Sequence, residues 1–332
     1  MTSNVPAARP AAGQRPDGPT PRPDARPRKK RGSDRSRSEA RLGWYLAGPA
    51  FVVMLAVTMY PILQALYDSL FSLRLTAPDE TELVWFRNYQ VVLGDPAFWQ
   101  SLAVTAFITV VTVVIELVLG FFIALVMHRA ATKLRGIVRT AILVPYGIIT
   151  VVSAFAFFYA FDINSGGYIN NWFNWIPGIT ENLNWFAGQN TSLFVIILSE
   201  VWKTTPFISL LLLSGLAQVP GDLEEAAKVD GATSWQAFRK VIVPLASPGV
   251  FTTAIITFFT AWNDFVFAIS LTSDRARTVP AALAFFTGAS QFEQPFGAIS
   301  AAAVIVTIPV VILVLLFQQR IVSGLTSGAV KG

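Results

Sequence analysis

Residues 102–127 read LAVTAFITVVTVVIELVLGFFIALVM, and Glu116 is the one charged side chain among them. A helix needs about 20 apolar residues to cross the hydrocarbon core of a bilayer, so this stretch is long enough to span it. Strands of a membrane barrel are shorter and alternate apolar with polar side chains, which this stretch does not do. The pattern therefore predicts a membrane-spanning helix.

The whole chain shares this character, because 53% of its 332 residues are hydrophobic, 14% are charged and the mean hydropathy is +0.54. Such a composition is atypical of a soluble domain. Apolar runs of spanning length occur at about 43–69, 102–128, 137–161, 193–217, 241–270 and 297–319. We therefore predict an all-α polytopic membrane protein with six transmembrane helices.

Cysteine is absent and His128 is the single histidine. This excludes disulfides, a thiolate nucleophile and a cysteine metal site, and one histidine cannot build a multi-histidine metal centre. We interpret His128 as a boundary residue at the membrane face, and we expect no catalytic residue and no metal ligand.

The distribution of lysine and arginine predicts the orientation of the spans. Of the 25 basic residues, 20 lie in the N-terminal tail, the second and fourth connections and the C-terminal end. Arg74, Arg87, Arg275 and Arg277 lie in connections on the other side, and Lys203 lies within a span. The excess predicts a multi-pass protein of the cell membrane with both termini in the cytoplasm.

Residues 1–41 form a tail rich in proline, arginine and serine, and it lacks hydrophobic periodicity. We expect the tail to be disordered and attracted to anionic lipid headgroups. Nucleic acid is not an expected partner, because no folded basic domain accompanies the tail. Residues 42–332 are the predicted six-helix domain.

The connection at about 220–240 reads PGDLEEAAKVDGATSWQAFRK, and its residues predict two short helices. Asp222 and Glu225 have the spacing of a capping box at the start of the first helix. Asp230 precedes Gly231, which predicts an end at which the glycine takes a left-handed conformation. Thr233 or Ser234 would then cap a second helix that continues into the membrane.

The first of these helices is too short to be stable alone in water. Ala226 and Ala227 allow another surface to approach its backbone closely, while Glu224, Glu225 and Asp230 offer carboxylates to basic groups. From the residues alone, a partner surface and an ordinary solvated loop helix both remain open.

This connection resembles the EAA loop of ABC-importer permeases. The matching positions are Glu225-Ala226-Ala227, then Gly231 after three residues, then Val241 after nine, then Val243-Pro244, and the stretch EAAKVDGATSWQAFRKVIVPLASP is similar to the carbohydrate-importer branch. The resemblance implies a type I ABC-importer permease fold. It also implies that residues Glu224, Glu225, Ala226, Ala227, Asp230 and Gly231 form a coupling helix that docks on an ABC ATPase dimer.

The same resemblance implies further partners, namely a second permease and an extracytoplasmic sugar-binding protein, besides membrane lipids. It implies that ATP is used by the partner ATPase and that this chain binds no cofactor, in keeping with the lack of a G-x-x-x-x-G-K-[ST] phosphate loop. A disaccharide such as trehalose or maltose follows as the expected solute.

Two parts of the chain resemble different members of that family. The stretches IELVLGFFIALVMHR and EVWKTTPFISLLLLSGLA look like the first permease of a trehalose importer, whereas the chain from about DLEEAAKVDGA onward looks like the second. The change from the first resemblance to the second falls near residues 215–225. The sequence leaves open whether the chain pairs with another permease or with itself.

Charged residues inside a membrane are costly and usually face a cavity or a partner. Glu200 and Lys203 are three residues apart and can share a helix face, so they are expected either to pair or to line a solute path. Lys203 could instead reach the carbonyl that Pro206 leaves without its helical donor. Glu116 is expected to be either a buried protonated acid or a proton relay.

Trp262, Asn263 and Asp264 follow one another in the fifth predicted span. An indole beside an amide and a carboxylate could stack on a sugar and bind its hydroxyls. The alternative is hydrogen bonding between helices. Tyr146, after Pro145, is a further candidate for the substrate pathway.

The leading hypothesis is a permease subunit of an ATP-driven sugar importer, which is not itself an enzyme. A secondary transporter driven by an ion gradient would favour paired intramembrane acids at helical spacing and an inverted repeat, and a membrane enzyme would need clustered acids, histidines or metal ligands at one face. None of these patterns is evident in the sequence.

Overall fold

The computed structural model describes residues 34–74, 79, 81–129, 135–164, 167–173, 175, 182–272, 276–286 and 295–326. Its contacts divide the chain into two units, Met1–Tyr60 and Pro61–Gly332. Most of the predicted disordered tail, residues 1–33, lies outside the described part. The structure differs from the prediction over residues 34–41, because helix α1 (Asp34–Asp68) already begins at Asp34.

In the first unit, the described residues belong to α1, and large apolar side chains are exposed along it. Trp44, Tyr45 and Leu46 are 69%, 82% and 75% exposed. Exposed apolar side chains on every side are expected of a helix that lies in lipid or against a partner rather than in a protein core.

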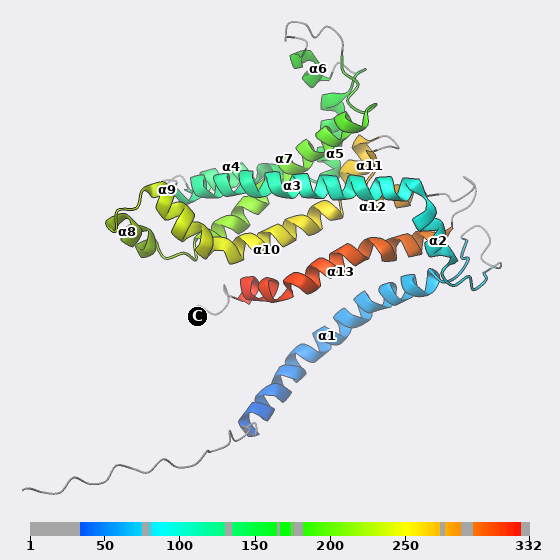
Figure 1. Ribbon diagram of the computed structural model, residues 1–332, viewed down its shortest axis with the longest axis horizontal. Helices are drawn as coiled ribbons and strands as arrows, with labels where there is room; N and C mark the ends of the chain where they lie inside the picture. The colour runs from blue at the N-terminus through cyan, green and yellow to red at the C-terminus, as the bar shows by residue number, and fades with distance from the viewer. Residues whose placement is uncertain are drawn as a thin grey trace, which may run out of the picture. The chain divides into compact units, whose positions relative to one another are not determined.

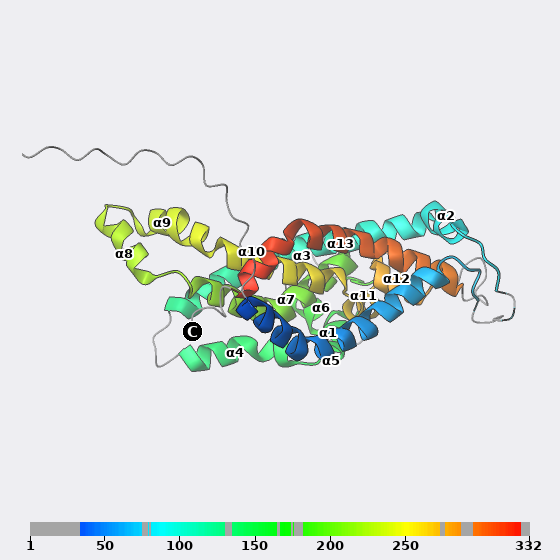
Figure 2. The same cartoon turned by 90° about the horizontal axis from the view of Figure 1, so that it is seen from below.

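The core of the second unit is built from three long helices, α3 (Pro96–Arg129), α7 (Gln189–Leu216) and α10 (Val243–Trp262). They pack on one another in all three pairs (Figures 1 and 2). Small residues permit this approach: a Cβ added at Gly249 of α10 would lie 2.9 Å from the Cα of Gly215 on α7. The backbones of α7 and α10 therefore touch near the ends that lead into the 220–240 connection.

The third predicted span is bent. Its residues form α4 (Arg135–Gly147) and α5 (Thr150–Phe161), with an angle of 81° at the break between them. Five further helices of the described chain are long and apolar enough to cross a membrane, so counting the bent pair as one span gives the six that the sequence predicts.

The fifth span ends earlier than predicted. Its helix, counted with the short segments before α10, runs over Ser234–Trp262. The helix ends at Asn263, and a separate helix, α11 (Val266–Leu271), follows. The prediction of one span over 241–270 is wrong at this end. The sequence stays apolar through residues 266–271, but these residues form the separate helix α11 and do not continue α10.

Shorter elements occupy the two ends of the second unit. At one end lie α2 (Arg87–Gly94), α12 (Val279–Ala284) and the start of α13 (Phe296–Thr326), which we call the α2 end. At the opposite end, the α8 end, lies α8 (Gly221–Val229) (Figures 1 and 2). Helix α6 (Tyr168–Phe173) follows α5 and is anchored by Asn170, whose carboxamide accepts a hydrogen bond from Trp185 Nε1 at 2.9 Å.

Candidate functional site

Helix α8 begins without the predicted capping box. Pro220, in extended conformation, is the residue before the helix, and no side chain caps the first turn. Because the helix already starts at Gly221, Asp222 lies inside the first turn instead of before it. Its carboxylate, with that of Glu224, is placed to interact with the positive end of the helix dipole rather than to cap.

The other end of α8 confirms the prediction for Gly231. This residue has a φ of +87°, the only positive-φ glycine among the described residues. Its amide donates to the carbonyl of Lys228 at 3.0 Å, and the Ala232 amide donates to the carbonyl of Ala227 at 2.9 Å. This pair of bonds is a Schellman motif, which requires a left-handed residue that glycine adopts at no steric cost.

A capping box is present, but on the second helix. The backbone N–H of Gln236 donates to Thr233 Oγ1 at 3.2 Å, and the backbone N–H of Thr233 donates to Gln236 Oε1 at 2.9 Å. The prediction of a cap at Thr233 is confirmed. From there α9 (Ser234–Ala237), a π-helical turn η2 (Phe238–Ile242) and α10 follow without interruption.

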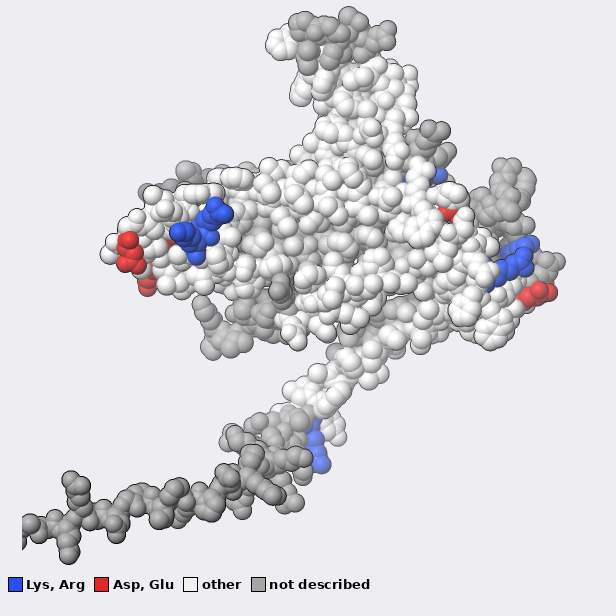
Figure 3. Space-filling model, in the orientation of Figure 1, with Lys and Arg blue, Asp and Glu red and all other residues white. Residues whose placement is uncertain are grey.

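The surface of α8 is open, since none of its residues is buried. Val229 is 87% exposed and Leu223 is 40% exposed, while Glu224 forms an ion pair of 2.7 Å with Lys228. Ala226, Glu225 and Asp230 are exposed and Ala227 is half-buried. Acidic side chains gather at this end of the unit, with basic ones beside them (Figure 3).

An exposed helix of nine residues gains little from burial, so its Schellman motif, its ion pair and its contacts with α9 and η2 are what hold it. The face that carries Glu225, Ala226 and Asp230 is thus available to another protein. Four of the six predicted coupling residues lie on α8, and Asp230 and Gly231 follow directly at its C-terminal end.

The second group of candidate residues lies inside the three-helix core. Glu116 of α3 and Glu200 of α7 are 1% and 3% exposed, and Asp264, just beyond α10, is 8% exposed. Glu200 lies near enough to Glu116 and Asp264 to interact electrostatically with both. Thr204 bridges two of the helices, because its hydroxyl contacts the carboxyl of Glu116 and the backbone carbonyl of Glu200.

The predicted ion pair between Glu200 and Lys203 is not formed. Lys203 Nζ donates instead to the backbone carbonyls of Tyr146, at 3.4 Å, and Ile148. These carbonyls belong to the break between α4 and α5, where helical donors are missing. The lysine therefore ties the bent span to α7, and the carbonyl one turn before Pro206 is not its acceptor.

Tyr146 takes part in the same contact. Its ring stacks on Phe207 with 4.8 Å between centroids, and Lys203 Nζ lies 5.9 Å from the ring centroid. The side chain is 43% exposed. Among the predicted pathway residues, Tyr146 and Asn263 are the exposed ones.

Trp262, Asn263 and Asp264 are not brought together on one open surface. The Trp262 ring stacks on Phe258 at 5.4 Å and is 6% exposed, while the exposed Asn263 donates to the carbonyl of Phe259 at 2.8 Å. The Asp264 carboxylate accepts from the amides of Phe267 and Ala268 at 3.3 and 3.1 Å, which caps α11. These contacts give Asp264 a structural role.

Sequence reasoning missed the buried hydroxyl groups of the core. Besides Thr204, which contacts Glu116, the Thr112 hydroxyl lies close to the Glu200 carboxyl. The buried hydroxyls of Thr109 and Thr205 have no hydrogen-bond partner, and neither do the buried atoms Glu200 Oε2 and Trp262 Nε1. The spacing of Thr105, Thr109, Thr112 and Glu116 follows one face of a helix and could have identified them. In the described part of the chain, no group of three or more acids, histidines or cysteines is arranged to hold a metal ion.

The role of Lys203 can be tested by Lys203→Met, which keeps the length of the side chain and removes its charge. The carbonyls of Tyr146 and Ile148 then lose their donor, and leaving buried polar groups unpaired costs about 1–3 kcal/mol. We expect the purified protein to unfold at a lower temperature. Glu200→Gln, which removes no donor from these carbonyls, is the matched variant; an equal loss in both would contradict this assignment.

Comparison with known proteins identifies the class. Residues 116–327 match the family described as binding-protein-dependent transport system inner membrane component, and the chain belongs to this family. It is therefore a membrane-embedded, multi-pass permease subunit of an ABC transporter.

The particular relatives are sugar permeases. The chain is 46% identical over 213 residues to the trehalose transport system permease protein SugA of Mycobacterium tuberculosis, covering 64% of this chain and 67% of SugA. It is 40% identical over 253 residues to SugB of the same organism, covering 75% and 83%. The two matched lengths together exceed the length of the chain, so the matches overlap.

A solved structure supports the fold. The chain superposes with a TM-score of 0.69 on a bacterial ABC transporter described as involved in the import of the acidic polysaccharide alginate, at 18% identity, covering 86% of this chain and 98% of that one. At this identity the likeness shows the fold alone, which is the predicted type I importer permease fold.

Proposed function

We propose that this chain is a permease subunit for a neutral disaccharide, such as trehalose or maltose, in an ATP-driven importer. The observation that carries the proposal is α8, an exposed helix closed by a left-handed Gly231 and placed between two membrane spans. The similarity to SugA and SugB, which are trehalose transport system permease proteins, supports the class of solute.

The α8 end lies in the cytoplasm in this proposal, together with both termini, and the α2 end lies outside. The basic residues support this orientation, since 20 of the 25 lie in segments that the six predicted spans assign to the same side as the 220–240 connection. An ABC ATPase dimer would dock on α8 and would close when it binds ATP, which this chain is not expected to bind.

Movement of α8 would reach the membrane through its two neighbours. Helix α7 leads into α8, and α9 with η2 leads from it into α10. The close contact of Gly215 with Gly249 joins α7 and α10 at the base of this arm. A push on α8 would therefore move both helices together, which is what alternating access to a solute path requires.

The orientation predicts the outcome of reporter fusions. A reporter fused after Gly332 should be cytoplasmic, and one inserted near Gly166 should lie outside, because an odd number of predicted spans separates the two positions. Activity of a cytoplasmic reporter at both positions would contradict the six-span topology.

The remaining partners are a second permease and an extracytoplasmic sugar-binding protein. The mixed resemblance of the two parts of the chain supports pairing with a different permease rather than with a second copy. Mass measurement of the detergent-solubilised complex, with identification of its subunits, tests this. We expect one copy of this chain, another permease and two ATPase subunits; two copies of this chain without another permease would contradict the pairing.

A further inference from the structure

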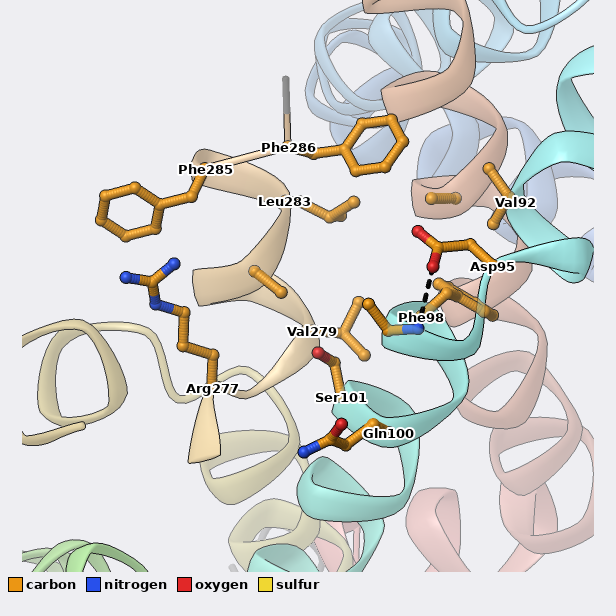
Figure 4. Close-up of a pocket in the computed structure, with 13 residues that line it drawn as sticks. Val92, Asp95, Phe98, Gln100, Ser101, Arg277, Val279, Leu283, Phe285 and Phe286 are labelled. Carbon is orange, nitrogen blue, oxygen red and sulfur yellow. Dashed lines mark hydrogen bonds between the residues drawn. The ribbon is translucent and has the colours of Figure 1, made fainter. Parts of the chain in front are cut away.

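The α2 end contains a cavity of about 320 Å³ that is separate from α8 and from the buried acids. Its walls come from the junction of α2 with α3, from α12 with the residues beside it, and from α13 (Figure 4). The volume is within the range of small-molecule sites, which measure about 300–1,000 Å³.

The polar lining of this cavity is balanced in charge. Arg277 is its one basic residue and Asp95 its one acidic residue, and Gln100 and Ser101 add a carboxamide and a hydroxyl. Asp95 Oδ1 accepts from the Ala97 amide at 2.9 Å, which fixes the carboxylate and leaves Oδ2 as a further acceptor. Such a lining suits a neutral polar molecule better than a phosphate or another anion.

Aromatic rings supply the other surfaces. Phe98, Phe285 and Phe286 line the cavity, and the guanidinium of Arg277 lies 3.9 Å from the centroid of the Phe285 ring. Stacking fixes the guanidinium by its face, so its N–H groups point outward in its plane. Figure 4 shows Arg277 with Phe285 on one side of the cavity and Asp95 with Phe98 on the other.

We propose that this cavity is a saccharide subsite. A sugar ring has an apolar face for the phenyl rings and hydroxyl groups that hydrogen-bond to a guanidinium, a carboxylate and a carboxamide. The inference rests on the proposed function for its class of ligand and for the extracytoplasmic position of the α2 end.

Gln100 connects this subsite with a neighbouring cavity. It also lines a space of about 540 Å³ between α3 and α7, whose polar lining includes Gln189 and Asn190. These amide groups, which can exchange hydrogen bonds with sugar hydroxyls, lie in the first turns of α3 and α7, and the rest of the lining is apolar. The buried acids of the three-helix core, by contrast, lie behind packed side chains.

Binding of trehalose to the full chain, purified in lipid nanodiscs with its accompanying subunits, tests the proposal. Saturation-transfer difference NMR is suited to weak binding and reports transfer from aromatic protons. We expect Arg277→Gln and Phe285→Ala each to weaken binding about tenfold, as the loss of a charge-assisted contact or a stacking surface predicts. Arg87→Gln is the matched control, since Arg87 is exposed on α2 and does not line the cavity.

The unfolding temperature of each variant is measured on the same samples. Phe285→Ala is expected to leave folding intact, because Phe285 is 47% exposed and its removal opens no buried cavity. Unchanged trehalose binding in both cavity variants would overturn the subsite. If inorganic phosphate displaces trehalose from the unaltered protein but not from Arg277→Gln, the cavity binds an anion, and the assignment of a neutral ligand is wrong. ATP-dependent uptake by the unaltered complex is scored separately, so failure of the transport function is distinguished from failure of the subsite.

Discussion

Replacing Gly231 with valine should reduce ATP-driven sugar uptake about tenfold or more, while the protein still inserts and accumulates in the membrane. The physical reason is the φ of +87° at this residue, where a β-branched side chain is strained by about 1–3 kcal/mol. Strain of this size lowers the equilibrium constant for closing the Schellman motif by about 5- to 160-fold. Helix α8, with Glu225 and Ala226, would then tilt or fray at the point where the ATPase is expected to dock.

Gly221 provides a matched control. An added Cβ meets nothing within 4 Å at either glycine, and only Gly231 has a positive φ. We therefore expect Gly221→Val to retain most uptake, and Gly231→Asn to retain more than Gly231→Val, because asparagine tolerates the left-handed region. Membrane abundance, ATPase co-purification and uptake are measured on one preparation. Parental uptake and parental substrate-stimulated hydrolysis in Gly231→Val would contradict the coupling role of α8.

Asp264→Ala should strongly reduce the amount of folded protein. The substitution removes the acceptors of the Phe267 and Ala268 amides, which lie in buried surroundings. Each donor left unpaired costs about 1–3 kcal/mol, a large part of the stability of a typical domain. The start of α11 and its packing against α5 and α7 would be lost first.

Asp264→Asn separates this structural role from a sugar contact. Asparagine caps helices about as well as aspartate, so the protein should fold and unfold near the parental temperature. Thermal unfolding and sugar uptake are compared for both variants. If Asp264→Ala unfolds at the parental temperature yet loses sugar uptake, then Asp264 contacts the solute and the capping role is wrong.

The features that the sequence predicts best are those that depend on the residues of a single helix or turn. Residues 102–127 could be assigned to a span because an apolar run of that length has few other structures available. Gly231 and Thr233 could be assigned to helix ends because the requirements for a left-handed residue and for a cap are local. The EAA-type spacing then pointed to the family to which the chain belongs.

The contacts that were predicted wrongly are those between residues of two different elements of secondary structure. Helical spacing placed Lys203 beside Glu200, but it carried no information on the break between α4 and α5, whose carbonyls attract the lysine. The same limit explains why Asp264 was taken for a candidate sugar contact, since the amides that it caps lie beyond a helix break that hydropathy does not reveal. Acids on three segments also meet in the core, although no two have helical spacing within one span.

The central claim is that ATP hydrolysis by a partner drives solute movement through this chain. The most direct measurement is trehalose accumulation in proteoliposomes that contain the purified complex and the sugar-binding protein, with ATP or a non-hydrolysable analogue on the α8 side. We predict accumulation with ATP, none with the analogue, and no response to an imposed proton or sodium gradient. Accumulation driven by an ion gradient without ATP would contradict the account and favour a secondary transporter.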